Sequence, residues 1–517
     1  MFAVLVPYAL VAALALFLNR LDATGCRGRG GDLLVDGTPL VLITLLYSSA
    51  LLLTGRSLFS GLLAAGGALL LFAVNRLKLS QFKEPLVFVD FGLFAQMLRH
   101  PRFYFPYIFP LRVVLTVALA VFGMAVLYRL QSPLEAWVRL PWVLFYAALL
   151  PTILILLRFS PVGEGWVAAL VEKRRPAFDP NTDFAAFGLT GSLLLHALAH
   201  AHRSGRDGEG GAMPRDRLSP ECVWPPADLA PVSGEKPHVV LVQAESFFDL
   251  RRADPGIDSS IYTNFARLRG EGVSGEMQVS AHGAYTMRTE FSVLTGIPNG
   301  KLGTDAMNPY LSAAHRRVWS LADYFGKQGY RCICVHPYDL KFFRRDEVMP
   351  NLGFDELHGE GLFCSTERIG PYVGDEVLAE YLLSLLENSG EPLFIFAITI
   401  EAHGPWDGDR FKDMSTPPEP VAAPGWGGPG MAAYLTHLRD TDRMLGILAD
   451  APCHGRDRVI ALYGDHVGCV PEDRPVNGNT DYLVWSSQGG TAVRRDIRPE
   501  DMGGLVAGIA RETTKTD

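Results

Sequence analysis

The sequence contains few cysteines, and its charge is weighted toward the negative sign. Its 517 residues include seven cysteines, an odd number, and no two of them have the spacing of a zinc finger. Cys332 and Cys334 alternate with apolar residues in an expected strand, which favours buried core positions, and no disulfide can be assigned among the others. The formal net charge is −8, and the region after residue 236 has no basic patch interleaved with aromatic residues. We therefore expect no nucleic-acid partner.

The first third of the chain is far more apolar than the mean hydropathy of +0.15 suggests. It contains five nearly charge-free runs close to bilayer length, which predict five transmembrane helices in a membrane domain over residues 1–158. The first run lacks both a basic n-region and a small-residue cleavage site, so we expect a retained helix and not a signal peptide. The alternative is that one run is a buried soluble helix. The runs are Phe2–Leu18, Leu40–Thr54, Leu58–Val74, Val113–Tyr128 and Trp142–Leu157.

Residues 159–236 have the composition of a connector. Within them, Asp183–His202 carries an apolar stretch, 184–198, that is short and contains two glycines, which favours an interfacial helix lying along the membrane over a sixth span. Its three histidines form either the polar edge of that helix or a metal-binding tract. Arg203–Pro214 has the composition of a flexible linker. The domain expected over residues 237–510 is long enough for a large core.

Four apolar runs of this last domain each end at polar residues suited to metal or phosphate chemistry. Continuous apolar runs bounded by turn signals predict strands buried on both faces, as in a parallel sheet of an α/β domain. Ligands of such sheets bind outside the carboxyl ends of the strands. We therefore expect a mainly parallel central sheet with a functional site at one edge. The runs and the residues that follow them are 238–244 with Glu245, 331–335 with His336, 393–400 with Glu401 and His403, and 459–463 with Asp465 and His466.

The carboxylates and imidazole of Glu245, Asp465 and His466 form a mixed ligand set that suits Zn²⁺ or Mn²⁺. A glycine-bearing loop at 280–285 then leads into a helix that begins near Thr286. A hydroxyl at a helix N-terminus lies among unpaired N–H groups that favour an anion, and contact with a metal would lower its pKa. Thr286 and Thr289 are candidate nucleophiles, and plain N-caps are the alternative.

These motifs resemble those of the lipoteichoic acid synthases and related phosphoglycerol transferases of the alkaline phosphatase/sulfatase superfamily. The resemblance rests on Val-Gln-Ala-Glu245-Ser, Thr286-Met-Arg-Thr-Glu-Phe and Tyr-Gly-Asp465-His466, in this order and with five membrane helices before them. It implies one divalent ion, usually manganese, held by Glu245, Thr286, Asp465 and His466, with Thr286 as the nucleophile. Zn²⁺ and Mg²⁺ are the alternatives, and no organic cofactor is expected.

The resemblance also implies a substrate pocket. His403 in Glu-Ala-His-Gly-Pro-Trp matches the phosphoglycerol-binding histidine, and Phe343 with Arg345 matches an aromatic-x-Arg element in which many members have tryptophan. His336 matches a polar position of the same pocket. Without the resemblance, His403 could be a turn histidine, Arg345 part of a solvated charged stretch, and His336 a loop closure. The segment after His466 is shorter than in long polymerases, which puts polymerisation in doubt more than transfer.

The activity that the resemblance implies is transfer of phosphoglycerol from phosphatidylglycerol to a glycan or polymer hydroxyl, through a phospho-threonine intermediate. A phosphoethanolamine transferase shares the metal and the threonine and is the first alternative. A sulfatase-like hydrolase is a second, although the C/S-x-P-x-R motif of true sulfatases is absent: Cys334-Val-His-Pro337 misplaces the proline and lacks the arginine. The intact metal set argues against a non-catalytic sensor.

The resemblance places the protein in the bacterial cytoplasmic membrane, with the catalytic domain outside the cytoplasm. Counting back through five helices then puts the long basic loop 76–112 outside, which contradicts the positive-inside rule. We hypothesise that this loop lies on the membrane surface and gathers anionic lipid. The alternative is an ordinary cytoplasmic loop in a chain of inverted topology.

Overall fold

The fold described here is that of a computed structural model. The chain forms two compact units, residues Met1–Gly211 and Ala212–Asp517, and each is described by itself. The structure describes residues 2–22, 33–92, 111–206, 234–280, 283, 285–366, 368–406, 409–419, 421, 429–453, 455–468, 470 and 476–514.

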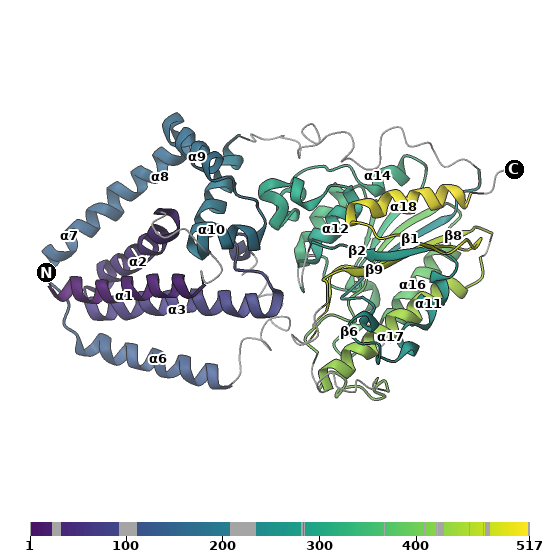
Figure 1. The fold of residues 1–517 in the computed structure, drawn as a ribbon, viewed down its shortest axis with the longest axis horizontal. Coiled ribbons are helices and arrows are strands. Elements are labelled where there is room, and N and C mark those ends of the chain that lie inside the picture. The colour runs from purple at the N-terminus through teal and green to yellow at the C-terminus, as the bar shows by residue number, and fades with distance from the viewer. Residues whose placement is uncertain are drawn as a thin grey trace. The chain divides into compact units, whose positions relative to one another are not determined.

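The described part of the first unit is helical (Figure 1). Helices α1, α2 and α3 pack together around a small apolar core that includes Val11, Ile43, Tyr47, Leu51 and Ala64. A π-helical segment, Phe145–Leu149, joins α7 to α8. The helices are α1 Phe2–Asp22, α2 Leu33–Thr54, α3 Ser57–Phe82, α6 Leu111–Leu130, α7 Ala136–Leu144, α8 Leu150–Phe159, α9 Pro161–Arg174 and α10 Pro180–Arg206.

Among the described residues, five helices are long and apolar enough to cross a membrane. Four of them, α1, α2, α3 and the joined α7–α8, contain runs that the sequence predicts as spans. The predicted span Val113–Tyr128 falls on α6, of which Leu115–Leu130 counts as a shorter apolar helix. The fifth is Pro180–Ala201 of α10, where the sequence predicts an interfacial helix. The number of such helices equals the number of predicted spans, but the two sets differ. By length and composition, α10 takes the place of α6.

Helix α10 lies across one end of the α1–α3 bundle. It is broken at Gly188, whose φ of 68° and ψ of 176° are not helical. Thr190 Oγ1 lies 2.8 Å from Thr38 Oγ1 near the start of α2, and the His200 ring lies 6.1 Å from that of Phe88, just after α3. Both contacts are at the end of the bundle where α1 stops and α2 starts. This arrangement favours the interfacial placement, which remains a prediction.

Two histidines of α10, His196 and His200, make contacts within the first unit. His196 is buried, and its Nε2 lies 2.7 Å from Asp183 Oδ2, while the Asp183 carboxylate also accepts from the main-chain N–H groups of Ala177 and Phe178. This pair closes the turn that starts the helix, which favours the polar-edge interpretation over a metal tract. The predicted linker Arg203–Pro214 lies mostly outside the described residues, so the boundaries 159–236 and 237–510 remain predictions.

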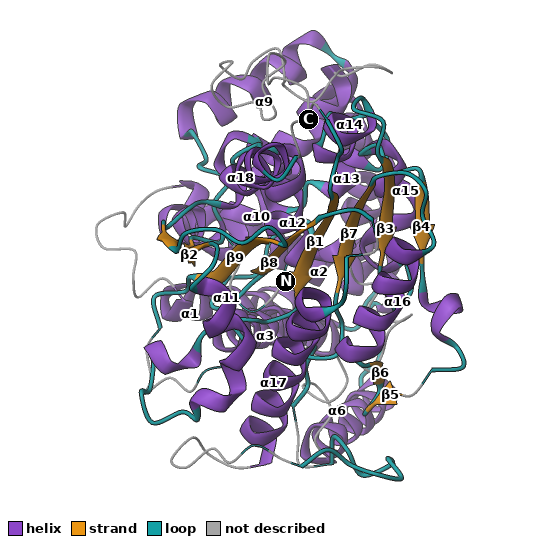
Figure 2. Cartoon of the chain, turned by 90° about the vertical axis from the view of Figure 1, so that its right-hand side faces the viewer, coloured by secondary structure: helices purple, strands orange, loops and turns teal. Residues whose placement is uncertain are grey.

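The second unit is built on an eight-stranded sheet with the order β10-β2-β9-β8-β1-β7-β3-β4 (Figure 2). The five strands from β8 to β4 are parallel, and β9 runs antiparallel to both β8 and β2. This confirms the predicted mainly parallel sheet. The strands are β1 His238–Ala244, β2 Val273–Met277, β3 Arg331–Val335, β4 Glu356–His358, β7 Leu393–Ile398, β8 Arg458–Gly464, β9 Thr480–Ser486 and β10 Val493–Arg494, with β5 Arg368–Ile369 and β6 Tyr372–Val373 as a separate pair.

Helices cover both faces of this sheet, so its central strands are fully buried, as their continuous apolar runs require. Figure 2 shows α12, α14 and α18 on one face and α11, α16 and α17 on the other. The helices are α11 Thr263–Arg269, α12 Thr286–Thr295, α13 Tyr310–Ala313, α14 Leu321–Gly326, α15 Arg345–Asn351, α16 Asp375–Glu387, α17 Pro429–Asp450 and α18 Pro499–Glu512.

The register of the parallel strands brings their carboxyl ends together. Ala244, the last residue of β1, pairs with Gly464, the last residue of β8. The next residue on each strand is a carboxylate. Gly464 must be glycine, because a Cβ there would lie 1.8 Å from the Phe247 carbonyl oxygen. The close approach of two chain segments at this point therefore sets where the second carboxylate lies.

Gly464→Ala should lower the free energy of unfolding of the catalytic unit by about 3 kcal/mol, the upper part of the range for overpacking, because main-chain atoms must move to admit the methyl group. The measurement is thermal denaturation of the detergent-solubilised chain. Gly300→Ala is the matched control: a Cβ at Gly300 meets no atom within 4 Å, so its effect should stay within about 0.5 kcal/mol. Equal melting temperatures for the two variants would contradict the argument.

Candidate metal and phosphate site

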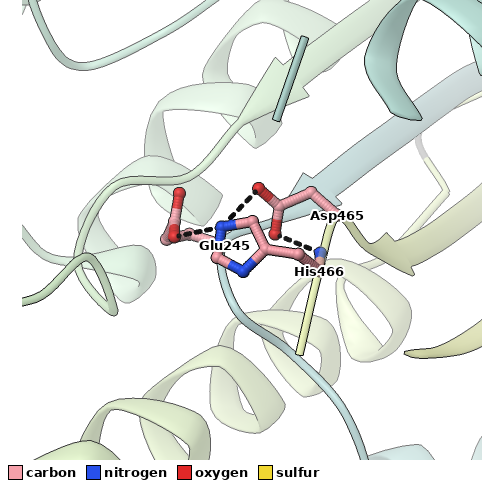
Figure 3. A group of neighbouring side chains, drawn as sticks. All are labelled: Glu245, Asp465 and His466. Carbon is pink, nitrogen blue, oxygen red and sulfur yellow. Dashed lines mark hydrogen bonds and ion pairs between the residues drawn. The ribbon is translucent and has the colours of Figure 1, made fainter. Parts of the chain in front are cut away.

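Three side chains that follow β1 and β8 form a compact cluster (Figure 3). Ligand atoms of Glu245, Asp465 and His466 all lie within 4.8 Å of one another, and the three residues are buried. His466 Nε2 is 3.3 Å from Glu245 Oε1 and 3.4 Å from Asp465 Oδ2. The structure thus brings together three of the four predicted metal ligands.

The electrostatics of this cluster suit a cation. Burial and the nearby charge of Glu245 raise the pKa of Asp465 to about 6. Burial alone would raise the pKa of Glu245 too, but His403, His466 and the Ser246 hydroxyl hold it at about 2. Burial opposes the charge of His466, yet the two carboxylates raise its pKa to about 9. Two buried carboxylates converging on one imidazole nitrogen are the donor set that Zn²⁺ or Mn²⁺ takes.

Thr286 lies directly beside this cluster, at the first position of α12. Its Oγ1 donates a hydrogen bond of 2.8 Å to Asp465 Oδ2. The N-cap of the helix is Tyr285, with a φ of 61°, so Thr286 is not the N-cap. Thr289 Oγ1 instead donates to the main-chain oxygen of Asp465, at 2.9 Å. Of the two candidate nucleophiles, Thr286 is the one whose hydroxyl meets a predicted ligand carboxylate.

Arg345 is buried and paired, contrary to the solvated-face alternative. Only 2% of it is exposed. Its Nε donates to Glu290 Oε1 at 3.1 Å and its Nη2 to Glu290 Oε2 at 2.8 Å, while Nη1 lies 3.4 Å from His336 Nε2. Two of the three guanidinium nitrogens are therefore committed to Glu290, and the third points to the predicted pocket residue His336.

Glu290 is a residue whose role the sequence analysis missed. Besides Arg345, Gln243 Nε2 and the Tyr310 hydroxyl donate to its carboxylate, at 2.9 and 2.5 Å. It lies one helical turn after Thr286 on α12, so one helix carries the candidate nucleophile and the anchor of Arg345. The four-residue spacing between Thr286 and Glu290 was the available signal.

The two pocket histidines lie close to the cluster, His336 buried and His403 partly buried. His336 Nδ1 lies 3.1 Å from the Ile398 carbonyl and therefore donates to it, and burial together with Arg345 lowers its pKa to about 3. His403 Nδ1 donates in the same way to Gly404 O at 2.8 Å, and burial lowers its pKa against the raising effect of Glu245. Both imidazoles are thus neutral and turn Nε2 away from the main chain. The Arg345 guanidinium lies 5.4 Å from the ring centre of Phe343.

Main-chain and hydroxyl groups that the sequence did not reveal hold the carboxylates in place. The Ser246 N–H donates to Asp465 Oδ1 and its hydroxyl to Glu245 Oε1, both at 2.8 Å. Thr399 Oγ1 accepts from the Glu245 N–H at 3.0 Å. Serine next to a ligand and threonine after a strand are too common to stand out in a single sequence.

Comparison with known proteins agrees with this architecture. A family model described as Sulfatase matches residues 237–502. The capsular polysaccharide biosynthesis protein RkpI of Rhizobium meliloti is 29% identical over 474 residues, 88% of this chain and 82% of that protein.

Two solved structures of transferases are also similar. The integral membrane lipooligosaccharide phosphoethanolamine transferase A of Neisseria meningitidis is 13% identical, with a TM-score of 0.52 over 98% of this chain and 97% of that chain. The Streptococcus pyogenes phosphoglycerol transferase GacH, in complex with sn-glycerol-1-phosphate, is 22% identical, with a TM-score of 0.44 over 54% of this chain and 75% of that chain.

The first of these structures shares the fold along nearly the whole chain, with apolar helices followed by a sulfatase-like domain. The family model covers more than half of the chain and contains every candidate ligand described above. The chain therefore belongs to the sulfatase family.

Proposed function

We propose that this protein is a membrane-bound phosphotransferase that moves phosphoglycerol from phosphatidylglycerol to a hydroxyl of a glycan or polymer. The observation that carries the proposal is the hydrogen bond from Thr286 to Asp465, which places a hydroxyl nucleophile on a buried metal-type cluster. The apolar helices of the first unit would keep the enzyme beside a lipid donor. The similarity to a capsular polysaccharide biosynthesis protein supports a glycan as the acceptor.

Glu245, Thr286, Asp465 and His466 would hold a single divalent ion, for which we propose Mn²⁺. Bound there, the ion would neutralise charge on the phosphoryl oxygens and lower the pKa of the threonine. The residues present fit such an ion, because ligand atoms of two carboxylates and an imidazole lie within 4.8 Å of one another and the Thr286 hydroxyl lies 2.8 Å from Asp465 Oδ2.

The chemistry is a double displacement. Thr286 Oγ1 forms a bond to phosphorus as the bond from phosphorus to the diacylglycerol oxygen breaks, and an acceptor hydroxyl later displaces Thr286. In the structure the hydroxyl hydrogen of Thr286 is directed to Asp465 Oδ2. The proton that Thr286 releases would be accepted by Nε2 of His403, whose Nδ1–H is held by Gly404 O, and would then pass to the leaving oxygen, while the ring orients the headgroup.

Arg345 and His336 would form the far side of the phosphoglycerol pocket. Glu290 accepts hydrogen bonds from two guanidinium nitrogens of Arg345, so only the third nitrogen, Nη1, is directed to the pocket. Arg345 would therefore contact the phosphoglycerol through one nitrogen and not as a bidentate donor. Phe343 would pack against the glycerol. A phosphoethanolamine headgroup would use the same metal and threonine, and the fold shared with a phosphoethanolamine transferase makes it the second candidate.

We further propose that the chain lies in the bacterial cytoplasmic membrane with its catalytic unit outside. The basic loop that opposes this topology carries less free charge than its sequence suggests. Lys78 is buried, and its Nζ bonds Asp90 Oδ2 at 2.5 Å and Pro85 O at 2.8 Å.

Loss of a metal ligand should abolish ion binding without unfolding the protein. Glu245→Ala or Asp465→Ala should weaken Mn²⁺ binding by more than about 100-fold. Loss of a residue that only supports a metal ligand costs at most about 100-fold, and loss of a ligand itself should cost more. Isothermal titration of the full-length protein measures this. Asp450→Ala removes an exposed carboxylate at the end of α17 and should bind Mn²⁺ as the wild type does. Full occupancy in either ligand variant would refute the assignment.

Thr286→Ala should lower diacylglycerol release from phosphatidylglycerol by at least about 1,000-fold, because loss of a nucleophile removes the covalent route. Mass spectrometry of the wild type with Mn²⁺ and phosphatidylglycerol, without acceptor, should find one phosphoglycerol on the peptide that contains Thr286. Thr289→Ala, the matched control, should keep the adduct.

An adduct on Thr289, or undiminished release by Thr286→Ala, would contradict the nucleophile assignment. A phosphoethanolamine adduct from the matching lipid would keep the site and change the group transferred. Release of free glycerol phosphate at the rate of lipid cleavage, with a sugar acceptor present, would instead indicate a hydrolase.

A periplasmic reporter fused at the C-terminus should be active, because the proposed donor and acceptors meet outside the cytoplasm. The same reporter fused after Thr54, at the end of α2, should be inactive, since five spans place that end inside. The reverse pair of activities would show that the topology is inverted.

A further inference from the structure

Arg410 donates hydrogen bonds to several main-chain carbonyl groups of the segment that carries His403. It is 7% exposed. Its Nη2 donates to the carbonyl oxygens of Glu401 and His403, both at 2.8 Å, and its Nη1 donates to Pro405 O at 3.1 Å. A single guanidinium thus bonds three carbonyls spread over five residues, with His403 at their centre.

A buried histidine holds Arg410 from the other side. Arg410 Nε donates to His437 Nε2 at 3.1 Å, so this nitrogen must be the acceptor and the ring must be neutral. The proton of His437 is then on Nδ1, which donates to Glu401 Oε1 at 2.7 Å. Burial and Arg410 hold the pKa of His437 well below its usual value, in keeping with the neutral ring.

The same network ties the segment to two helices. Glu401 Oε2 accepts from the N–H of Asp375, the first residue of α16, at 2.6 Å, and His437 is part of α17. Tyr372 lies between the two groups, with its ring centre 5.0 Å from the Arg410 guanidinium carbon and 6.0 Å from the His403 ring centre. The backbone that presents His403 is therefore fixed on three sides by groups other than the metal cluster.

We propose that Arg410, held by His437 and Glu401, is a positioning residue that acts through His403. The proposal rests on the proposed function, in which His403 orients the phosphoryl group and protonates the leaving oxygen. The guanidinium is suited to this task because its planar set of donors reaches three carbonyls and His437 at once, which a lysine ammonium cannot do.

The test is a double-mutant cycle in the full-length enzyme with Mn²⁺ and phosphatidylglycerol micelles, measured as diacylglycerol release. Arg410→Lys should lower kcat by about 10- to 100-fold with little change in KM, because a misplaced catalytic group costs up to about 100-fold. His403→Gln should lower kcat at least as far. The double variant should be no slower than His403→Gln within about threefold, since residues that act as a unit are not additive.

Arg458 provides a matched structural control at the opposite edge of the sheet. It is the first residue of β8, is buried, and also clamps three carbonyls: Nη1 donates to Leu448 O at 2.9 Å, and Nη2 donates to Pro452 O at 2.6 Å and to Ala451 O. Arg458→Lys should lower the melting temperature but leave kcat within about twofold, and its effect should add to that of His403→Gln.

If Arg410→Lys does not fold, His437→Asn replaces it in the cycle, because it removes the acceptor of the Arg410 Nε proton and keeps Arg410 itself. Additive effects of either variant with His403→Gln would overturn the inference, and so would a kcat for Arg410→Lys equal to that of Arg458→Lys.

Failure of the proposed function has a different signature. If Thr286→Ala releases diacylglycerol as fast as the wild type, that function falls, while the coupling between His403 and Arg410 is still read from the same assay. If the wild type releases none, the cycle is run on hydrolysis of bis(p-nitrophenyl) phosphate, and additivity there overturns the inference in the same way.

Discussion

Two buried carboxylates at the ends of adjacent parallel strands are the constraint on which the site depends. The pairing of Ala244 with Gly464 brings Glu245 and Asp465 together in a buried site, where their repulsion is screened less than in bulk solvent. Burial and repulsion raise the pKa of Asp465 to about 6, and a positive charge between the carboxylates, from the His466 imidazolium or a bound cation, offsets that repulsion. The surrounding hydrogen bonds from Ser246 act against this tendency to separate, because they fix both carboxylates before any ion binds. The sheet thus provides a preorganised site at the expense of local stability.

Helix α12 extends that constraint to the rest of the site. Its first residue, Thr286, bonds Asp465, and Glu290 one turn later holds two nitrogens of Arg345. A buried ion pair stabilises a protein only when its remaining hydrogen-bonding capacity is satisfied. Here Gln243 and Tyr310 also donate to Glu290. Thr286 and Arg345 are therefore placed by one rigid element, and a shift of α12 would move both relative to the cluster.

The parallel sheet and the cluster of Glu245, Asp465 and His466 could both be predicted from the sequence, because both depend on where apolar runs end. A strand buried on both faces is a continuous apolar run, and the polar residue that ends it is visible without knowing its partners. The partners of Arg345 and Arg410 were not visible, because Glu290 lies 55 residues from the first and His437 27 residues from the second. Neither distance has a periodicity that a pattern can reveal. Helix α10 was ambiguous for another reason: its length and apolarity fit a span, while its contacts at one end of the bundle, such as Thr190 with Thr38, depend on tertiary packing.

The charges of the site bear on which phosphate esters it can accept. Glu245 and Asp465 would balance a divalent ion, Arg345 is balanced by Glu290, and burial keeps His336 and His403 neutral. No net positive charge then remains among these groups, so each negative charge of the substrate adds to that of the threonine alkoxide. A phosphodiester brings one charge and a phosphomonoester two, and in a buried site the second is opposed far more strongly than in water. In the proposed mechanism, with Thr286 as the nucleophile, this charge balance would therefore favour diesters such as a phospholipid headgroup over monoesters.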